Sequence, residues 1–239
     1  MSFVPAVSTP RIIAHRGASA EKPENTLPAF RRAIARRADG IELDVQVTRD
    51  GVPVVFHDDD LRRLTGVRGD LAALTWTELR RLRVAGRERI PRLAEVLRTV
   101  RGRIPVQVEM KAGASVPEVV AAVRAGGGKD AVILASFSVS LVAEAKRCAP
   151  EIPRMIITEG RRPKAWLAAQ LRRTGAAGLS VNHRSIRTAA WVRYFHERGW
   201  TVWSWTVNDA ATARRLAEAG VDALIGDDPA LLRRALSLS

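Results

Sequence analysis

The sequence predicts an α/β fold, a closed parallel (β/α)8 or TIM barrel with one small insertion. Short apolar runs alternate with amphipathic helical patterns almost to the end of the chain, which is typical of parallel strands joined by crossover helices. One hairpin signal reduces nine strand-like runs to the eight that a closed barrel needs. The length of 239 residues is also close to the roughly 250 residues usual for one such barrel.

Each expected strand is a short run of apolar residues, the pattern of a parallel strand buried on both faces. The nine runs are Arg11–His15, Gly40–Val47, Pro53–His57, Pro105–Met110, Ala131–Phe137, Arg154–Thr158, Gly178–Asn182, Thr201–Val207 and Asp222–Ile225. Amphipathic helices are expected between them, at Thr26–Arg37, Leu93–Val100, Pro117–Ala125, Ser138–Arg147, Pro163–Arg172, Ile186–Glu197 and Asp209–Ala219.

The third run is expected to fold back onto the second. Asp50-Gly51 is a hairpin signal, because this pair accommodates the positive φ values of tight turns. No helix fits between Val47 and the third run, Pro53–His57, which therefore runs antiparallel above the barrel rim. An open doubly wound sheet is the main alternative, but it usually carries an early glycine-rich dinucleotide loop, which this sequence lacks.

Residues 59–90 interrupt the alternation of strands and helices. They hold turn residues, many arginines and one short helical pattern at Thr77–Leu82. We expect an insertion on the strand-end face rather than a separate domain. Residues 1–239 are therefore expected to form one barrel domain.

The charge balance is strongly basic. The 39 Lys and Arg residues exceed the 25 Asp and Glu residues, which gives a net charge of +14. This excess fits a nucleic-acid surface, a field that steers anionic substrates, or arginines solvated on helix faces. No interleaved aromatic residues or low-complexity tail accompany the arginines, so no nucleic-acid partner is expected.

Nothing in the sequence predicts a membrane span or export. No apolar run approaches the roughly 18 residues that a transmembrane helix needs, and Met1–Arg11 lacks the pattern of a signal peptide. Cys148 is the only cysteine, so no intrachain disulfide forms and a reducing compartment is allowed. We expect a cytoplasmic protein, and the sequence leaves its oligomeric state open.

Three carboxylates stand inside apolar strands. Glu42 and Asp44 are two residues apart and share one face of their strand, and Glu109 and Lys111 repeat this spacing on the next barrel strand. A buried acid is costly unless it is paired or bound to metal. Glu42, Asp44 and Glu109 would form an all-oxygen site suited to Ca²⁺ or Mg²⁺. The competing interpretation is a set of salt bridges to the abundant arginines.

Imidazoles end two of the runs. His15 and His57 follow apolar residues at strand ends, where barrel enzymes place catalytic groups. Arg16 offers a guanidinium that matches phosphate oxygens. Together with the acids, these are the parts of a metal-assisted phosphoester site. Trp205, near the end of its strand, is expected to wall the pocket, and His183 is a further candidate for lining it.

The combined motifs resemble those of glycerophosphodiester phosphodiesterases over about residues 11–229. The motifs are His15-Arg16-Gly17, Pro23-Glu24-Asn25-Thr26, Glu42-x-Asp44, Asp50-Gly51-x-Pro53-Val54-Val55-x-His57-Asp58, Glu109-x-Lys111, Ser136-Phe137 and Trp205-Thr206-Val207-Asn208. From its sequence position alone, Asn25 reads as a helix N-cap.

The resemblance implies a phosphatidylinositol-phosphodiesterase-like barrel with an insertion after the second His. It places the metal ligands on Glu42, Asp44 and Glu109, and the catalytic histidines on His15 and His57. It places phosphate contacts on Arg16 and Lys111.

The function that follows is metal-dependent hydrolysis of a glycerophosphodiester to glycerol 3-phosphate and an alcohol, with histidine acid/base catalysis. A lysophospholipase D or sphingomyelinase-D-like enzyme is the alternative. A non-catalytic basic phosphate- or nucleic-acid-binding protein is a weaker one. One departure is visible, because Gly226-Asp227-Asp228-Pro229 stands where the family usually has Thr-Asp-x-Pro. We expect this change to touch none of the proposed ligands.

Overall fold

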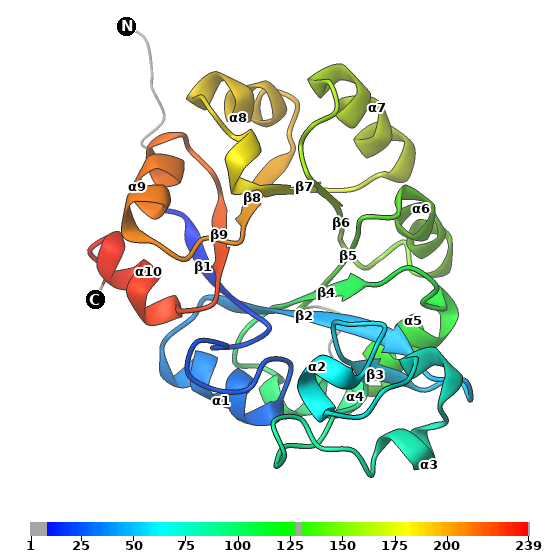
Figure 1. The fold of residues 1–239 in the computed structure, drawn as a ribbon. Helices are drawn as coiled ribbons and strands as arrows, with labels where there is room; N and C mark the ends of the chain where they lie inside the picture. The colour runs from blue at the N-terminus through cyan, green and yellow to red at the C-terminus, as the bar shows by residue number, and fades with distance from the viewer. Residues whose placement is uncertain (1–8, 128–130, 239) are drawn as a thin grey trace, which may run out of the picture.

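The computed structural model describes residues 9–127 and 131–238, and these form a closed barrel of parallel strands surrounded by helices (Figure 1). The barrel strands are β1 (Arg11–His15), β2 (Gly40–Val47), β4 (Val106–Met110), β5 (Val132–Ser136), β6 (Arg154–Thr158), β7 (Gly178–Asn182), β8 (Thr201–Trp205) and β9 (Ala223–Gly226). Each pairs in parallel with its neighbours, and β1 pairs with both β2 and β9, which closes the ring. The predicted fold class is confirmed.

Helices connect the strands on the outside of the barrel. They are α1 (Leu27–Ala35), α4 (Leu93–Val100), α5 (Val116–Ala125), α6 (Val139–Cys148), α7 (Lys164–Thr174), α8 (Ala189–His196), α9 (Ala210–Glu218) and α10 (Pro229–Ala235). Helix α10 was not among the predicted helices, and Asp228 caps it by accepting a hydrogen bond from the Leu231 amide at 2.9 Å. No helix in the described part of the chain is long and apolar enough to cross a bilayer.

The predicted hairpin is present. β3 (Pro53–Val55) pairs antiparallel with β2, with Val45 opposite Val55. Gly51 in the turn has φ +79°, a conformation that favours glycine. The strand is shorter than predicted, but the Phe56 amide still donates to the Asp44 carbonyl at 3.0 Å. This hydrogen bond fixes the backbone of the residue directly before His57.

The insertion between β3 and α4 contains more structure than expected. It holds α2 (Arg62–Thr65), the 3-10 helix η1 (Leu71–Ala73) and α3 (Trp76–Leu79). The predicted helix at Thr77–Leu82 begins earlier, at Trp76, because Thr75 and Glu78 form a capping box there, and it ends at Leu79. Buried apolar side chains hold the insertion to the barrel flank: Val54, Phe56, Leu61, Leu71, Leu79, Val84 and Ile90.

Two apolar layers support the barrel. One lies between the strands and the outer helices, and the other fills the barrel interior. The interior layer includes Ile13, Met155, Trp203 and Ile225, and the rim residue Trp205 packs against it. This interior layer fills the barrel, and the acidic and histidine side chains considered below lie toward the carboxyl ends of their strands.

Candidate active site

Sheet register brings three acidic side chains together. In the β2–β4 pair, Asp44 lies opposite Glu109 and Glu42 lies opposite Gln107. Glu42, Asp44 and Glu109 are all buried, and one carboxylate oxygen from each lies within 4.8 Å of the others. It is the one group of acidic, His or Cys side chains in the described residues with this geometry. Three buried carboxylates are the donor set that a hard divalent cation prefers.

The crowding of these acids shifts their titration. Burial and then the charge of Asp44 raise the pKa of Glu42 above its ordinary value. Burial and the same charge raise the pKa of Glu109. Burial also acts to raise the pKa of Asp44, but the charges of Lys111 and Arg16 outweigh it and hold that pKa low. The cluster concentrates negative charge that a bound cation would offset.

Two basic side chains lie against the same carboxylates. Lys111 Nζ is 2.8 Å from Asp44 Oδ1 and 2.5 Å from Glu109 Oε1. Arg16 Nε is 3.2 Å from Asp44 Oδ2, and its Nη1 donates to Glu24 at 2.7 Å. Arg16 and Lys111, the two residues predicted to contact phosphate, therefore lie beside the acidic group.

His15 ends β1, where the strand register places it opposite Glu42. Its Nδ1 is 2.6 Å from Asp227 Oδ1, and its Nε2 lies 4.0 Å from Glu42 Oε2. Burial lowers the pKa of His15, but the hydrogen bond to Asp227 and the charge of Glu42 outweigh it and raise the pKa above its ordinary value. Asp227 is itself held by Ser19 and Asn208, which donate to its two oxygens at 3.1 and 2.6 Å.

His57 has a matching arrangement on the other side of the acids. Its Nδ1 is 2.6 Å from Asp58 Oδ1. Arg63 of α2 in turn contacts both oxygens of Asp58, at 2.5 and 3.0 Å. The buried Gln46 Nε2 donates to the His57 carbonyl at 3.2 Å and to the Asp58 carbonyl at 2.7 Å. Both imidazoles are thus anchored through Nδ1, which leaves each Nε2 for contact with a ligand.

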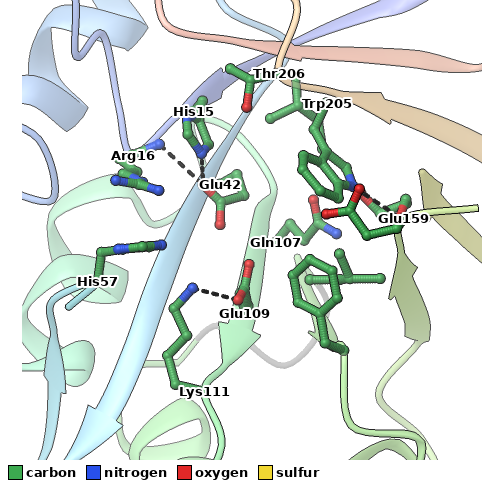
Figure 2. Close-up of a pocket in the computed structure, with 14 residues that line it drawn as sticks. His15, Arg16, Glu42, His57, Gln107, Glu109, Lys111, Glu159, Trp205 and Thr206 are labelled. Carbon is green, nitrogen blue, oxygen red and sulfur yellow. Dashed lines mark hydrogen bonds and ion pairs between the residues drawn. The ribbon is translucent and has the colours of Figure 1, made fainter. Parts of the chain in front are cut away.

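A cavity of about 230 Å³ joins these groups (Figure 2). Its lining comprises His15, Arg16, Glu42, His57, Gln107, Glu109, Lys111, Phe137, Ile157, Glu159, Ser180, Trp205, Thr206 and Ile225. The histidines, acids and cations lie on one side, and Trp205 and Glu159 lie across from them (Figure 2). Trp205 Nε1 donates to the Ser180 carbonyl at 3.0 Å, and its ring meets Phe137 edge-on at 5.6 Å.

All eight predicted site residues meet in one region: seven line the cavity, and Asp44 is grouped with the lining residues Glu42 and Glu109. His183 is not in this lining and begins the 3-10 helix η2 (His183–Ser185) after β7. The expectation for Asn25 was wrong, because Thr26 caps α1. Asn25 has φ +56° and donates from Nδ2 to Asp44 Oδ2 at 2.8 Å. It supports a carboxylate of the acidic group instead of a helix end.

Three supporting residues of the site were not predicted from the sequence. Asp227 and Arg63 were not singled out, although Asp227 stood within the departure from the family pattern. Glu24 is the third, and it accepts hydrogen bonds from both Arg16 and Arg63. The distance of 212 residues between His15 and Asp227 left no local pattern to connect them.

Comparison with known proteins decides the family. The sequence profile of the glycerophosphoryl diester phosphodiesterase family matches residues 15–231. The chain belongs to this family. It is accordingly a phosphodiesterase, a member of a family of hydrolases, and the site described above lies entirely within the matched residues.

Curated relatives match over almost the whole length. A glycerophosphodiester phosphodiesterase of Caldanaerobacter subterraneus is 33% identical over 235 residues, covering 92% of this chain and 95% of the relative. A glycerophosphodiester phosphodiesterase of Bacillus altitudinis is 30% identical over 236 residues, covering 92% and 95%.

Solved structures share the fold. A phosphodiesterase of Oleispira antarctica, in complex with the product sn-glycerol-3-phosphate, superposes with a TM-score of 0.87 at 29% identity, covering 96% of this chain and 97% of that one. A glycerophosphodiester phosphodiesterase of Thermotoga maritima gives a TM-score of 0.81 at 26% identity, covering 94% and 97%.

Proposed function

We propose that this phosphodiesterase hydrolyses glycerophosphodiesters to glycerol 3-phosphate and an alcohol with the help of Ca²⁺ or Mg²⁺. The single observation that supports this most is the placement of two Nδ1-anchored imidazoles in one cavity with Glu42 and Glu109, two members of the carboxylate triad. The product found in the Oleispira antarctica relative supports the same substrate class. Cytoplasmic residence stays a prediction from the sequence.

Glu42, Asp44 and Glu109 would hold the divalent ion, which supplies withdrawal of charge from the phosphoryl oxygens. Arg16 and Lys111 bind these oxygens and orient the diester, and such electrostatic stabilisation usually contributes more to catalysis than any other single effect. Excess positive charge elsewhere on the chain favours the approach of the anionic substrate.

The two histidines move protons in opposite directions. His15 accepts a proton at Nε2 from the attacking hydroxyl, and His57 donates one from Nε2 to the leaving alkoxide. The resemblance extends to phosphatidylinositol phospholipases C, so we assign the attack to the glycerol 2-hydroxyl. Water then opens the resulting cyclic phosphate. Asp227 and Asp58 fix the tautomers that this exchange requires.

The experiment that tests the function is an assay of choline release from glycerophosphocholine, with lysophosphatidylcholine in parallel and with glycerol 3-phosphate identified as the second product from glycerophosphocholine. We expect release from the first and little from the second, because the cavity of about 230 Å³ offers no long apolar groove. A preference for lysophosphatidylcholine would support the lysophospholipase D alternative. Absence of hydrolysis with any divalent ion, together with salt-dependent DNA binding, would favour the binding protein.

Asp227→Asn is expected to lower kcat by about 10- to 100-fold with little change in KM, because Asp227 holds the His15 tautomer without reaching the substrate. The removal of this carboxylate also lowers the pKa of His15. Since the base must be neutral, the acidic limb of the pH–rate profile should move to lower pH. Steady-state kinetics across pH check both effects, and an unshifted limb would contradict the assignment of His15 as base.

A further inference from the structure

Gln107 is a buried amide without a hydrogen-bond partner. It lies on β4 two residues before Glu109, so both side chains share one face of the strand. The residue is 2% exposed, and neither Nε2 nor Oε1 has a partner among the described residues. No other side chain in residues 9–127 and 131–238 buries two unpaired polar atoms.

A position on this sheet does not itself prevent pairing. Gln46, on the neighbouring β2, is also buried, yet its Nε2 donates to the Asp58 carbonyl at 2.7 Å. Buried polar groups in folded proteins are almost always satisfied, and an unsatisfied one calls for an explanation. Because Gln107 lines the cavity between Glu42 and Trp205 (Figure 2), its partner can come from a ligand in that cavity.

The chemistry of the amide restricts the ligand. Nε2 needs an acceptor and Oε1 needs a donor. A phosphoryl oxygen only accepts and an ammonium group only donates, so either would leave one atom unpaired. A hydroxyl group both donates and accepts. Ser180, Thr206 and the carboxylate of Glu159 also line this cavity and add polar groups suited to a polyol.

We infer that Gln107 binds the terminal hydroxyl of the glycerol moiety and selects substrates in which that hydroxyl is free. This inference rests on the proposed function, in which the 2-hydroxyl is engaged by His15. An acyl ester at the terminal oxygen removes the hydroxyl hydrogen that would donate a hydrogen bond to Oε1. It also adds a chain that the cavity of about 230 Å³ does not hold. The amide is therefore a specificity residue for deacylated diesters.

The test compares glycerophosphocholine with 2-hydroxypropyl phosphocholine, which keeps the 2-hydroxyl and lacks the terminal one. The wild type should prefer glycerophosphocholine by about 10- to 100-fold in kcat/KM, the range for one buried hydrogen-bonded hydroxyl. Gln107→Leu, which has a similar shape and no polar atoms, should lose that preference. Its kcat/KM for the analogue should stay within about threefold of wild type.

The control is Gln170→Leu on α7, whose Oε1 is also buried and unpaired but lies outside the cavity lining. It should leave the preference unchanged. Thermal unfolding separates binding from support of the fold. Because Gln107 makes no hydrogen bond within the described chain, Gln107→Leu should keep or raise Tm.

Equal loss on both substrates with a lowered Tm would overturn the inference, because Gln107 would then act on the fold. Equal wild-type rates on both substrates would overturn it too, while the proposed function would stand. If neither is hydrolysed under Ca²⁺ or Mg²⁺, the proposed function fails and the inference fails with it. If Gln107→Leu does not fold, the inhibition constants of two product-like compounds are measured on the wild-type enzyme instead. Glycerol 3-phosphate should bind about 10-fold or more tightly than 2-hydroxypropyl phosphate, and equal binding overturns the inference.

Discussion

His57→Ala is expected to abolish turnover, with kcat lowered by about 10²- to 10⁴-fold, the usual contribution of general acid–base catalysis. Metal binding should survive, because His57 is held by Asp58 and not by the acidic triad. The fold should survive as well, since Arg63 still neutralises Asp58 when the imidazole is absent. Single-turnover and steady-state kinetics, with calorimetry of metal binding, measure the two effects separately.

His183→Ala is the matched control for this variant. It removes the same side chain at the end of β7 without touching the cavity lining, so we expect nearly wild-type kinetics. Wild-type turnover by His57→Ala would remove the acid–base assignment. A substrate with a better leaving group sharpens the comparison, because a leaving group that needs no proton should recover part of the lost rate.

Glu109→Gln should weaken divalent-ion binding by about 100-fold or more and lower kcat by roughly 10³-fold, since a metal usually supplies several kcal/mol of charge stabilisation. With an ion bound and all three carboxylates ionised, the triad would contribute three negative charges, and Arg16 and Lys111 contribute two positive ones. A bound divalent ion would leave the group with a net positive charge that attracts a phosphodiester. The amide variant also leaves Lys111 with one carboxylate partner fewer.

Calorimetry with Ca²⁺ and Mg²⁺ is the direct measurement, together with activity after EDTA treatment and after metal is restored. Glu159→Gln is the control for binding, because Glu159 lines the cavity but does not belong to the triad. It should bind the ion as the wild type does. Unchanged affinity in Glu109→Gln would rule out Glu109 as a ligand, and full activity in EDTA would rule out metal dependence.

Much of the barrel could be predicted from the sequence because its strands are buried on both faces. Continuous apolar runs such as Val106–Met110 give a strong signal, and the Asp50-Gly51 turn resolved the ninth run as the hairpin strand β3. The insertion was harder to predict. Its short elements depend on local caps and on packing against the barrel flank, as with α3, whose start is set by the Thr75–Glu78 capping box.

The site was predictable where its residues lie two apart on strands, and less so where contacts span the chain. Glu42 and Asp44 could be assigned to one face of their strand from periodicity, whereas Glu109 joins them through the register between β2 and β4. The Asp227–His15 contact depends on closure of the barrel. The contact of Asn25 with Asp44 depends on the left-handed backbone conformation of Asn25, whereas its position just before a helix suggested a helix cap.

The departure at Gly226 also proved closer to the site than expected. The residue touches none of the proposed metal ligands, but the next residue, Asp227, contacts His15. A side chain at Gly226 would begin 2.1 Å from the Val207 carbonyl oxygen. The threonine usual in the family would therefore require the backbone near Val207 to move.

The pairing of β1 with β9 makes the order of biosynthesis matter. The residues of β1 are synthesised before those of β2 to β8, yet their ladder to Ala223 and Leu224 forms only after all of these strands have been made. Until then β1 and β8 present unpaired edges, which are prone to pair with other chains. We therefore expect nascent chains truncated before Ala223 to aggregate and to lack the His15–Asp227 contact, so that the site is completed only once β9 has been synthesised.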